Sequence, residues 1–311
     1  MLDWAVVAPR LAPRDLALVL AVVALWGFSF VPIKVGLEEI PPFAFAALRF
    51  FLAAVPLVFF VPPPRVPARL VIAYGLAIGV FQFGLLFLGM KLGMPAGLAS
   101  LVIQLQVFFT IGLGIAFLGD RLHSENVIGG IAAGIGVALL ALHQIGRGAD
   151  STLVGLALVI VAAVAWAIGN IVAKHAARHY HADMLGLVVW SSLAPPLPLL
   201  AASYAFEGGP AAWHAIASAG ALTWGCALFL AYLATIFGFG SWARMLHRYP
   251  TGLVAPFALL VPVSGLASGA VFLGESLAPL QLAGAGLVLA GLAVNVYGAR
   301  LGSRRAGAAH E

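Results

Sequence analysis

Long apolar runs separated by short polar segments make up almost the whole of the 311-residue chain. A helix needs about 20 apolar residues to cross the hydrocarbon core of a bilayer. By that measure the pattern predicts ten membrane-spanning helices, at residues 15–36, 41–61, 70–90, 95–118, 126–144, 152–173, 184–206, 215–243, 251–273 and 277–299. The start of the eighth run, near Pro210, either crosses with it or lies along the membrane interface.

The composition places the chain in a bilayer. It is 63% hydrophobic and 9% charged, whereas a soluble domain carries about 25% charged residues. The formal charge of +5 is therefore not a sign of nucleic-acid binding. The single cysteine, Cys226, excludes an intrachain disulfide framework. Arg14 and Asp15 interrupt any signal-peptide pattern at the N-terminus.

Basic residues are distributed unevenly between the two sides that ten spans define. Three lie on one side, namely Lys34, Lys91 and Arg147, and Arg49 lies inside the second span. The side that holds both termini collects the other twelve, which are Arg10, Arg14, Arg65, Arg69, Arg121, Lys174, Arg178, Arg244, Arg248, Arg300, Arg304 and Arg305. Cytoplasmic loops carry the excess of Lys and Arg. The pattern therefore predicts a multi-pass protein of a bacterial-type inner (plasma) membrane with both termini in the cytoplasm.

The second half of the chain repeats the first. At an offset of 155 residues, Pro95-Ala-Gly-Leu falls on Pro250-Thr-Gly-Leu, and residues 95–138 give twelve identities in 44 ungapped positions. Nearer the start of each half the offset is 140, which indicates an insertion around residues 207–218. We therefore expect an N-terminal five-helix repeat at 1–148 and a C-terminal one at 149–311, packed as one compact domain.

Five spans per half is an odd number, so the second half must cross the membrane in the opposite direction to the first. The predicted fold class is an all-α integral membrane protein of ten transmembrane helices, built from two inverted five-helix repeats around a central cavity. In transporters with inverted repeats the substrate site lies near the bilayer midplane between the repeats. Rocking of one half against the other then gives alternating access.

Several short motifs resemble the EamA family of the drug/metabolite transporter superfamily. They are Ala-Leu-Trp-Gly-Phe-Ser-Phe at 24–30, Leu-Arg-Phe-Phe-Leu-Ala at 48–53, Phe-Leu-Gly-Asp at 117–120 and Phe-Leu-Gly-Glu at 272–275. The resemblance implies a ten-helix bundle with a cavity lined mainly by spans 1, 3, 4, 6, 8 and 9, and export of metabolites, often amino acids. Two departures are the absence of a proline at Val107 and of a carboxylate at Trp26, eight residues before Lys34.

Polar and aromatic residues in the middle of spans are the candidate substrate ligands. Gln104 and Gln106 point about 200° apart on a regular helix, so only one of them can face the cavity. Gln104 shares a stripe with Ser100 and Phe108 and is the preferred ligand, unless it only bonds a neighbouring helix, which is the role expected for Gln106. The repeat-related Trp26 and Trp166 are expected to form opposite walls of the cavity unless they only pack. The other candidates are Tyr74, Phe81, Gln82, Asn170, Tyr232 and Phe257.

A charge in the middle of a span normally faces protein and has a partner. Arg49 has no acidic residue at its depth, so it either snorkels or bonds backbone carbonyls, and a structural role is favoured over substrate binding. Pro32, Pro256 and Pro262 are candidate kinks and hinges. No metal or other cofactor, no nucleic acid and no protein partner are expected.

Other functions fit the sequence less well. An intramembrane protease needs a buried base, and no histidine lies in the middle of a span. A channel usually shows rings of charge or carbonyl groups. The central Trp26 and Trp166, the mid-span amides and the scarcity of buried charge favour export of neutral aromatic and other apolar amino acids, with drug or other metabolite export as the alternative. Proton coupling usually needs a titrating group inside the membrane. Asp120 and Glu275 are the nearest, and strict coupling is not expected.

Overall fold

The computed structural model describes residues 11–55, 57–118, 122–146, 150–180, 183–249 and 251–308. These residues form helices throughout, without a strand. The first half contains α1 (Pro13–Phe28), α2 (Phe30–Glu39), α3 (Pro42–Ala54), η1 (Leu57–Phe59), α4 (Ala68–Gly75), η2 (Leu76–Phe83), α5 (Gly84–Lys91), α6 (Ala96–Val102), η3 (Ile103–Leu105), α7 (Gln106–Leu118) and α8 (Ser124–Gly146).

The second half is also entirely helical in the residues described. It contains α9 (Asp150–Tyr180), α10 (Met184–Ser191), α11 (Pro196–Phe206), α12 (Pro210–Ser218), α13 (Ala221–Leu228), η4 (Phe229–Phe237), α14 (Gly238–Arg248), α15 (Thr251–Val254), η5 (Ala255–Leu259), α16 (Leu260–Leu273) and α17 (Pro279–Ala308). The predicted division at residues 148 and 149 lies outside the described residues.

The ten predicted spans are confirmed, because the described residues contain ten helices long and apolar enough to cross a membrane. Most boundaries agree with the prediction to within a few residues. The eighth span starts at Ala221 rather than at residue 215, since α12 is a separate short helix. Trp213 of α12 has 57% of its surface exposed.

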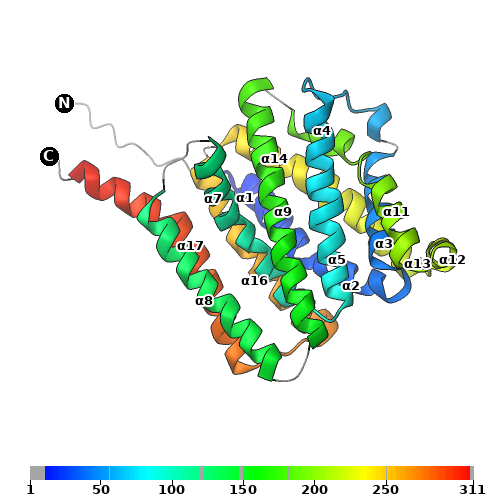
Figure 1. Ribbon diagram of the computed structural model, residues 1–311. Coiled ribbons are helices and arrows are strands. Elements are labelled where there is room, and N and C mark those ends of the chain that lie inside the picture. Colours follow the sequence, from blue (N-terminus) through cyan, green and yellow to red (C-terminus); the bar gives the residue numbers. More distant parts are fainter. Residues whose placement is uncertain are drawn as a thin grey trace.

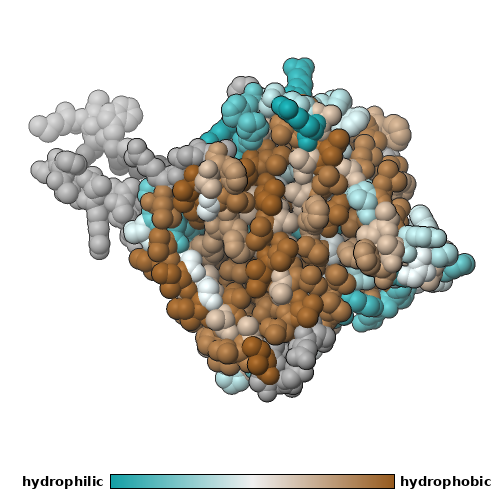
Figure 2. Space-filling view, viewed as in Figure 1, coloured by the Kyte–Doolittle hydropathy of each residue, from teal (hydrophilic) through white to brown (hydrophobic). Residues whose placement is uncertain are grey.

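Figure 1 shows the helices packed side by side, with α8 and α17 forming a pair along one edge of the bundle. Figure 2 shows a broad apolar surface over α8 and α9, with polar residues gathered toward two opposite ends. Helices at the apolar surface expose large side chains such as Ile131, Ile135 and Val161. This distribution suits a bundle surrounded by lipid between two polar interfaces.

Irregular turns recur at equivalent positions of the two halves. The π-helical η2 in span 3 corresponds, at the offset of 155, to residues 231–238, and the π-helical η4 covers Phe229–Phe237. The 3₁₀ turn η3 in span 4 likewise corresponds to the region of η5 in span 9. In span 9, Pro262 lacks the N–H that would bond the carbonyl of residue 258, which accounts for the irregular turn before it. The repeat seen in the sequence is therefore also present in the helix geometry.

The pair α8 and α17 is joined by glycines that stand at repeat-equivalent positions. A Cβ atom on Gly129 would lie 2.5 Å from the carbonyl oxygen of Gly291, and one on Gly136 would lie 2.6 Å from that of Gly284. At the offset of 155, Gly129 is equivalent to Gly284 and Gly136 to Gly291. Replacing each glycine by its repeat equivalent therefore turns one contact into the other. This is the relation expected of inverted halves around a pseudo-two-fold axis.

Charged residues at one end of the bundle bond to the backbone ends of neighbouring helices. Glu275 accepts hydrogen bonds from the amides of Ala96 (2.6 Å) and Gly97 (2.8 Å) at the start of α6. Gly274, with φ of 66°, ends α16 in the left-handed conformation that glycine favours, and so directs the chain to this contact. This gives the Phe-Leu-Gly-Glu motif a physical role in joining spans 9 and 4.

Two other carboxylates make contacts of the same kind. Glu207 accepts from the amides of Phe43 (2.8 Å) and Ala44 (3.2 Å) at the start of α3. Glu39 accepts from the amide of Gly220 (2.6 Å) at the start of α13. The first N–H groups of a helix have no partner within the helix, so each carboxylate satisfies free donors while joining two spans.

Candidate substrate site

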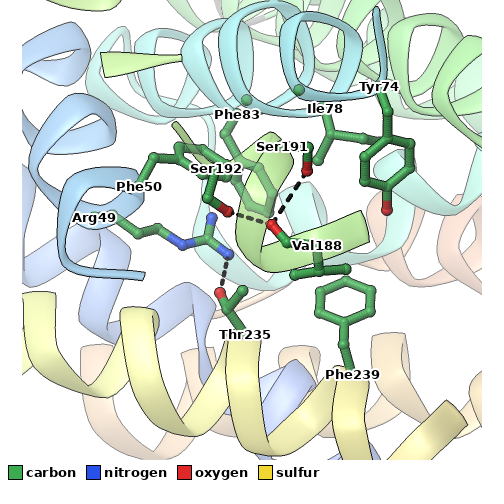
Figure 3. Close-up of a pocket in the computed structure, with 12 residues that line it drawn as sticks. Arg49, Phe50, Tyr74, Ile78, Phe83, Val188, Ser191, Ser192, Thr235 and Phe239 are labelled. Atoms are coloured by element: carbon green, nitrogen blue, oxygen red, sulfur yellow. Dashed lines mark hydrogen bonds between the residues drawn. The ribbon is translucent and has the colours of Figure 1, made fainter. Parts of the chain in front are cut away.

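The middle of the bundle contains a small, mainly apolar pocket between the two halves of the chain, with one buried cation in its lining. Arg49 of α3 is its only charged lining residue among those described, and only 3% of the Arg49 surface is exposed. Figure 3 shows the guanidinium of Arg49 pointing between helices of the first and the second half. The described lining residues are Arg49, Phe50, Tyr74, Gly75, Ile78, Gly79, Phe83, Val188, Ser191, Ser192, Thr235 and Phe239. We call this the Arg49 pocket.

Arg49 has neither of the arrangements expected from the sequence, since its side chain is buried within the bundle and donates to no backbone carbonyl of the described residues. Its Nη2 donates to the hydroxyl of Thr235 at 2.9 Å, and its guanidinium carbon lies 3.6 Å from the centroid of the Phe83 ring. The Thr235 hydroxyl donates in turn to the carbonyl of Leu230 at 2.8 Å. The Nε and Nη1 atoms are buried and have no hydrogen-bond partner among the described residues.

The hydroxyl side of the pocket comes from the end of α10. Ser191 and Ser192 both donate to the carbonyl of Val188, at 3.1 and 2.7 Å. These donations use the hydroxyl protons, so the oxygen lone pairs of both serines stay available as acceptors.

Glycines on span 3 allow span 7 to approach closely beside the pocket. A Cβ atom on Gly75 would meet the carbonyl of Ser191, and one on Gly79 would meet the ring of Pro195. Spans 3 and 7 therefore touch through backbone at this depth. The space that remains in the pocket is about 20 Å³, which is enough for about one water molecule.

The predicted site residues of span 3 divide between the pocket and other places. Tyr74 is buried and lines the Arg49 pocket. Gln82 is buried on η2 but is not among the lining residues. Phe81 has 56% of its surface exposed and lies outside the pocket. Of the three, only Tyr74 is thus brought to Arg49.

The predicted stripe of Ser100, Gln104 and Phe108 is interrupted by η3. Ser100 lies against Gly265 of α16, where a Cβ atom would meet its hydroxyl. Phe108 instead packs toward α8, with its ring 3.3 Å from a Cβ atom built on Gly129. A 3₁₀ turn has 3.0 residues per turn instead of 3.6, so the α-helical spacing used for the prediction does not hold across Gln104, which is buried.

Gln106 bonds a neighbouring helix, as expected. Asn170 of α9 donates through Nδ2 to the side-chain oxygen of Gln106 at 2.7 Å and to the hydroxyl of Thr110 at 3.1 Å. These three half-buried side chains form a second polar cluster, between spans 4 and 6. The predicted ligand Asn170 therefore already has a partner within the protein.

The two tryptophans lie in different packing environments. Trp26 donates through Nε1 to the carbonyl of Ala234 at 2.8 Å and packs 5.3 Å from the rings of both Phe239 and Trp242. It belongs to a small cluster formed by spans 1, 8 and 9. Trp166 packs instead against the main hydrophobic core. Their role as opposite walls of a substrate cavity stays a prediction.

The remaining predicted ligands are Tyr232 and Phe257. The hydroxyl of Tyr232 donates to the carbonyl of Val55 at 3.4 Å, which joins spans 8 and 2. Phe257 lines an apolar crevice of about 340 Å³ between spans 9 and 10. Pro256 lines the same crevice, and Pro32 follows the break between α1 and α2 at Ser29. Their function as hinges stays a prediction.

Ten of the twelve residues that line the Arg49 pocket were not among the candidate site residues taken from the sequence. They are Phe50, Gly75, Ile78, Gly79, Phe83, Val188, Ser191, Ser192, Thr235 and Phe239. One signal in the sequence could have indicated some of them. Arg49 has no carboxylate at its depth, so the hydroxyl groups in the middle of spans 7 and 8 were the side chains able to accept its hydrogen bonds.

Ten spans, helix irregularities repeated in both halves and a pocket with a buried cation between the halves are typical of a membrane transporter. The EamA-like transporter family matches the chain at residues 14–142 and 153–297, and the chain belongs to this family. The fold class and the family expected from the motifs are thereby confirmed.

Individual relatives agree with this assignment. A probable amino-acid metabolite efflux pump of Salmonella typhimurium is 46% identical over 289 residues, covering 93% of this chain and 96% of the relative. The Escherichia coli protein of the same description is 44% identical, with 92% and 96% covered. A probable terminal-alkyne amino-acid exporter of Streptantibioticus cattleyicolor is 29% identical, with 95% and 97% covered.

A solved crystal structure shares the fold. Its TM-score to this chain is 0.62 at 21% sequence identity, and the match covers 94% of this chain and 98% of that one. The chain is thus a multi-pass membrane transporter whose relatives include proteins described as exporting amino-acid metabolites.

Proposed function

We propose that this protein exports neutral amino acids and closely related metabolites from the cytoplasm, with preference for aromatic and other apolar side chains. The observation that carries the proposal is the Arg49 pocket, in which one cation and several hydroxyls stand among the rings of Phe50, Phe83 and Phe239. Such a lining suits a molecule with one polar end and one apolar end. A phosphorylated substrate would call for several buried cations.

The relatives support the same substrate class, because two of them are described as amino-acid metabolite efflux pumps and a third as an amino-acid exporter. The position of the pocket supports alternating access. Its lining comes from spans 2, 3, 7 and 8, so movement of one half against the other would open it to either side.

Transport without strict proton coupling is part of the proposal. Asp15, the one buried carboxylate among the described residues, lies near the start of α1 and bonds Arg248 (3.2 Å) and Tyr249 (2.5 Å). Glu275 lies at a helix end, and Asp120 falls outside the described residues. A carrier without a titrating group at the midplane would equilibrate its substrate downhill.

The test uses purified protein in liposomes, with counterflow and net flux measured for a panel of labelled amino acids. Exchange of phenylalanine, leucine and similar amino acids is expected with and without an imposed pH gradient. Uphill accumulation driven by the pH gradient alone would contradict the uncoupled mechanism. Exchange of drugs but of no amino acid would favour the alternative, a multidrug exporter.

Cytoplasmic termini are also proposed, on the charge asymmetry of the loops. A cysteine in place of the exposed His214 of α12, in a Cys226→Ala background, should react with an impermeant maleimide in intact cells. Reaction only after lysis would reverse the orientation.

A further inference from the structure

The guanidinium of Arg49 has donors that the protein leaves unused. Arginine carries five N–H bonds and cannot lose its charge. The Nη2 atom donates to Thr235, whereas Nε and Nη1, which together carry three N–H bonds, are buried without a partner. A buried charged donor without an acceptor is costly, so a group built to serve only the fold would be expected to have acceptors.

The surroundings leave the charge unneutralised but hold it in place. The described residues that line the Arg49 pocket include no acid. Phe83 lies under the guanidinium plane at 3.6 Å, and Thr235 fixes one edge. A planar cation held by one face and one edge, with its other donors free, is arranged to receive a planar anion.

We propose that Arg49 binds the α-carboxylate of the transported amino acid through the guanidinium N–H groups that the protein leaves unused. This inference rests on the proposed function and names the residue that receives the polar end of the substrate. A carboxylate accepts charge-assisted hydrogen bonds from guanidinium donors, and the second N–H of Nη2 can complete a bidentate pair with a neighbouring nitrogen. The rings of Phe50 and Phe239 then lie where the apolar part of the substrate begins.

The pocket must widen for this to happen, because about 20 Å³ is too small for an amino acid. The walls that would part are η2 and η4, which carry Gly79 and Thr235. Both are π-helical segments, a geometry that occurs frequently at functional sites. They are also equivalent in the repeat, so one movement of the halves acts on both walls of the pocket.

The alternative is that Arg49 only joins spans 2, 3 and 8 through Phe83 and Thr235. The two roles differ in what they predict for the substrate. A structural role makes no distinction between an amino acid and its carboxamide, which has the same shape without the negative charge. If Arg49 binds the carboxylate, its removal should abolish the preference for the amino acid over the carboxamide.

The experiment measures competition in counterflow by wild-type and variant protein in liposomes. The labelled substrate is the amino acid that the wild type exchanges best, and the competitors are the same amino acid and its carboxamide. In the wild type the acid should compete better than the amide by roughly tenfold to a hundredfold, the factor expected for one charge-assisted hydrogen bond. In Arg49→Gln that preference should collapse, with the amide still bound. Lys34→Gln, at the end of span 1, is the matched control and should keep the preference.

Amide and acid binding are also followed by thermal stabilisation of detergent-solubilised protein, so that a variant inactive in transport still gives a result. Preference for the acid that is unchanged in Arg49→Gln, or loss of both ligands in a folded Arg49→Gln protein, would overturn the inference. Should Arg49→Gln fail to fold, Thr235→Val decides, because loss of the fixed edge should weaken acid binding and leave amide binding unchanged. A wild type that exchanges no amino acid would instead contradict the proposed function.

Discussion

The charged side chains at the ends of the spans and the one in the Arg49 pocket are treated differently by the fold. Glu39, Glu207 and Glu275 each accept from free amides at the start of another helix. Arg49 contacts one hydroxyl and the rings of Phe83 and Phe50, and it has donors without a partner among the described residues. The difference teaches that charges at the ends of this bundle complete its structure, whereas the charge at its centre needs a further group to complete it.

The largest expected effect is on transport, in Arg49→Met. We expect export of neutral amino acids to fall by about tenfold or more. Stability should be unchanged or higher, because replacing an unpaired buried charge by an apolar residue is often neutral or stabilising. The Thr235 hydroxyl keeps its own acceptor, the carbonyl of Leu230. Flux per folded molecule and unfolding in mixed micelles measure the two effects. A destabilised variant with normal flux would make Arg49 structural after all.

In Glu275→Ala we expect a loss of stability rather than a loss of transport. Loss of two hydrogen bonds to Ala96 and Gly97 should lower the free energy of unfolding by about 1–3 kcal/mol, with transport per folded molecule largely retained. Glu275→Gln serves as the control, since its amide oxygen can still accept one of the two bonds. If Glu275→Ala were as stable as the wild type, the charges at the ends of the bundle could no longer be assigned a structural role that Arg49 lacks.

A smaller effect is expected at Lys34. Its Nζ donates to the carbonyl of Met90 at 3.1 Å, at the end of span 3. Lys34→Met should cost about 0.5–1.5 kcal/mol, the usual net value of one hydrogen bond. The measurement is again unfolding in mixed micelles, with Lys91→Met, which loses the equivalent bond to Leu37, as the companion variant. A loss of selectivity between acid and amide in Lys34→Met would show that end charges also handle substrate.

The smallest effect is expected in the second polar cluster. Asn170→Ala should cost about 0.6 kcal/mol, the average for interhelical hydrogen bonds in membranes, with transport nearly unchanged. Selectivity among amino acids provides the sharper readout. A changed selectivity in Asn170→Ala, with stability unaltered, would place substrate at spans 4 and 6 in addition to the Arg49 pocket.

The spans and the repeat could be predicted because each leaves a pattern in the sequence itself. The length of apolar runs fixes the spans, and fixed offsets of glycine and proline reveal the repeat. The pocket could not be predicted in the same way. Thr235 meets Arg49 across 186 positions of sequence, and nothing local marks that contact. The choice of Gln104 over Gln106 relied on a regular helix, whereas η3 alters the rotation at that point.

Arg49 itself was conspicuous in the sequence, but its role could not be read there. A lone charge in a span indicates a partner without showing whether the partner is protein or ligand. A protein partner and a ligand partner can be told apart only by finding which guanidinium nitrogens have hydrogen-bond acceptors. That depends on how spans 2, 3, 7 and 8 pack.

The glycine contacts between α8 and α17 have the symmetry of a homodimer. Gly129 meets Gly291 and Gly136 meets Gly284, so each half supplies the same pair of positions to the other. An interface of this kind is isologous, the type that two identical subunits form around a two-fold axis. The chain thus contains, between its own two halves, an interface with the geometry of one between identical subunits. The side chains around the two contacts differ, since the ring of Phe108 lies beside Gly129 and Leu140 lies beside Gly284.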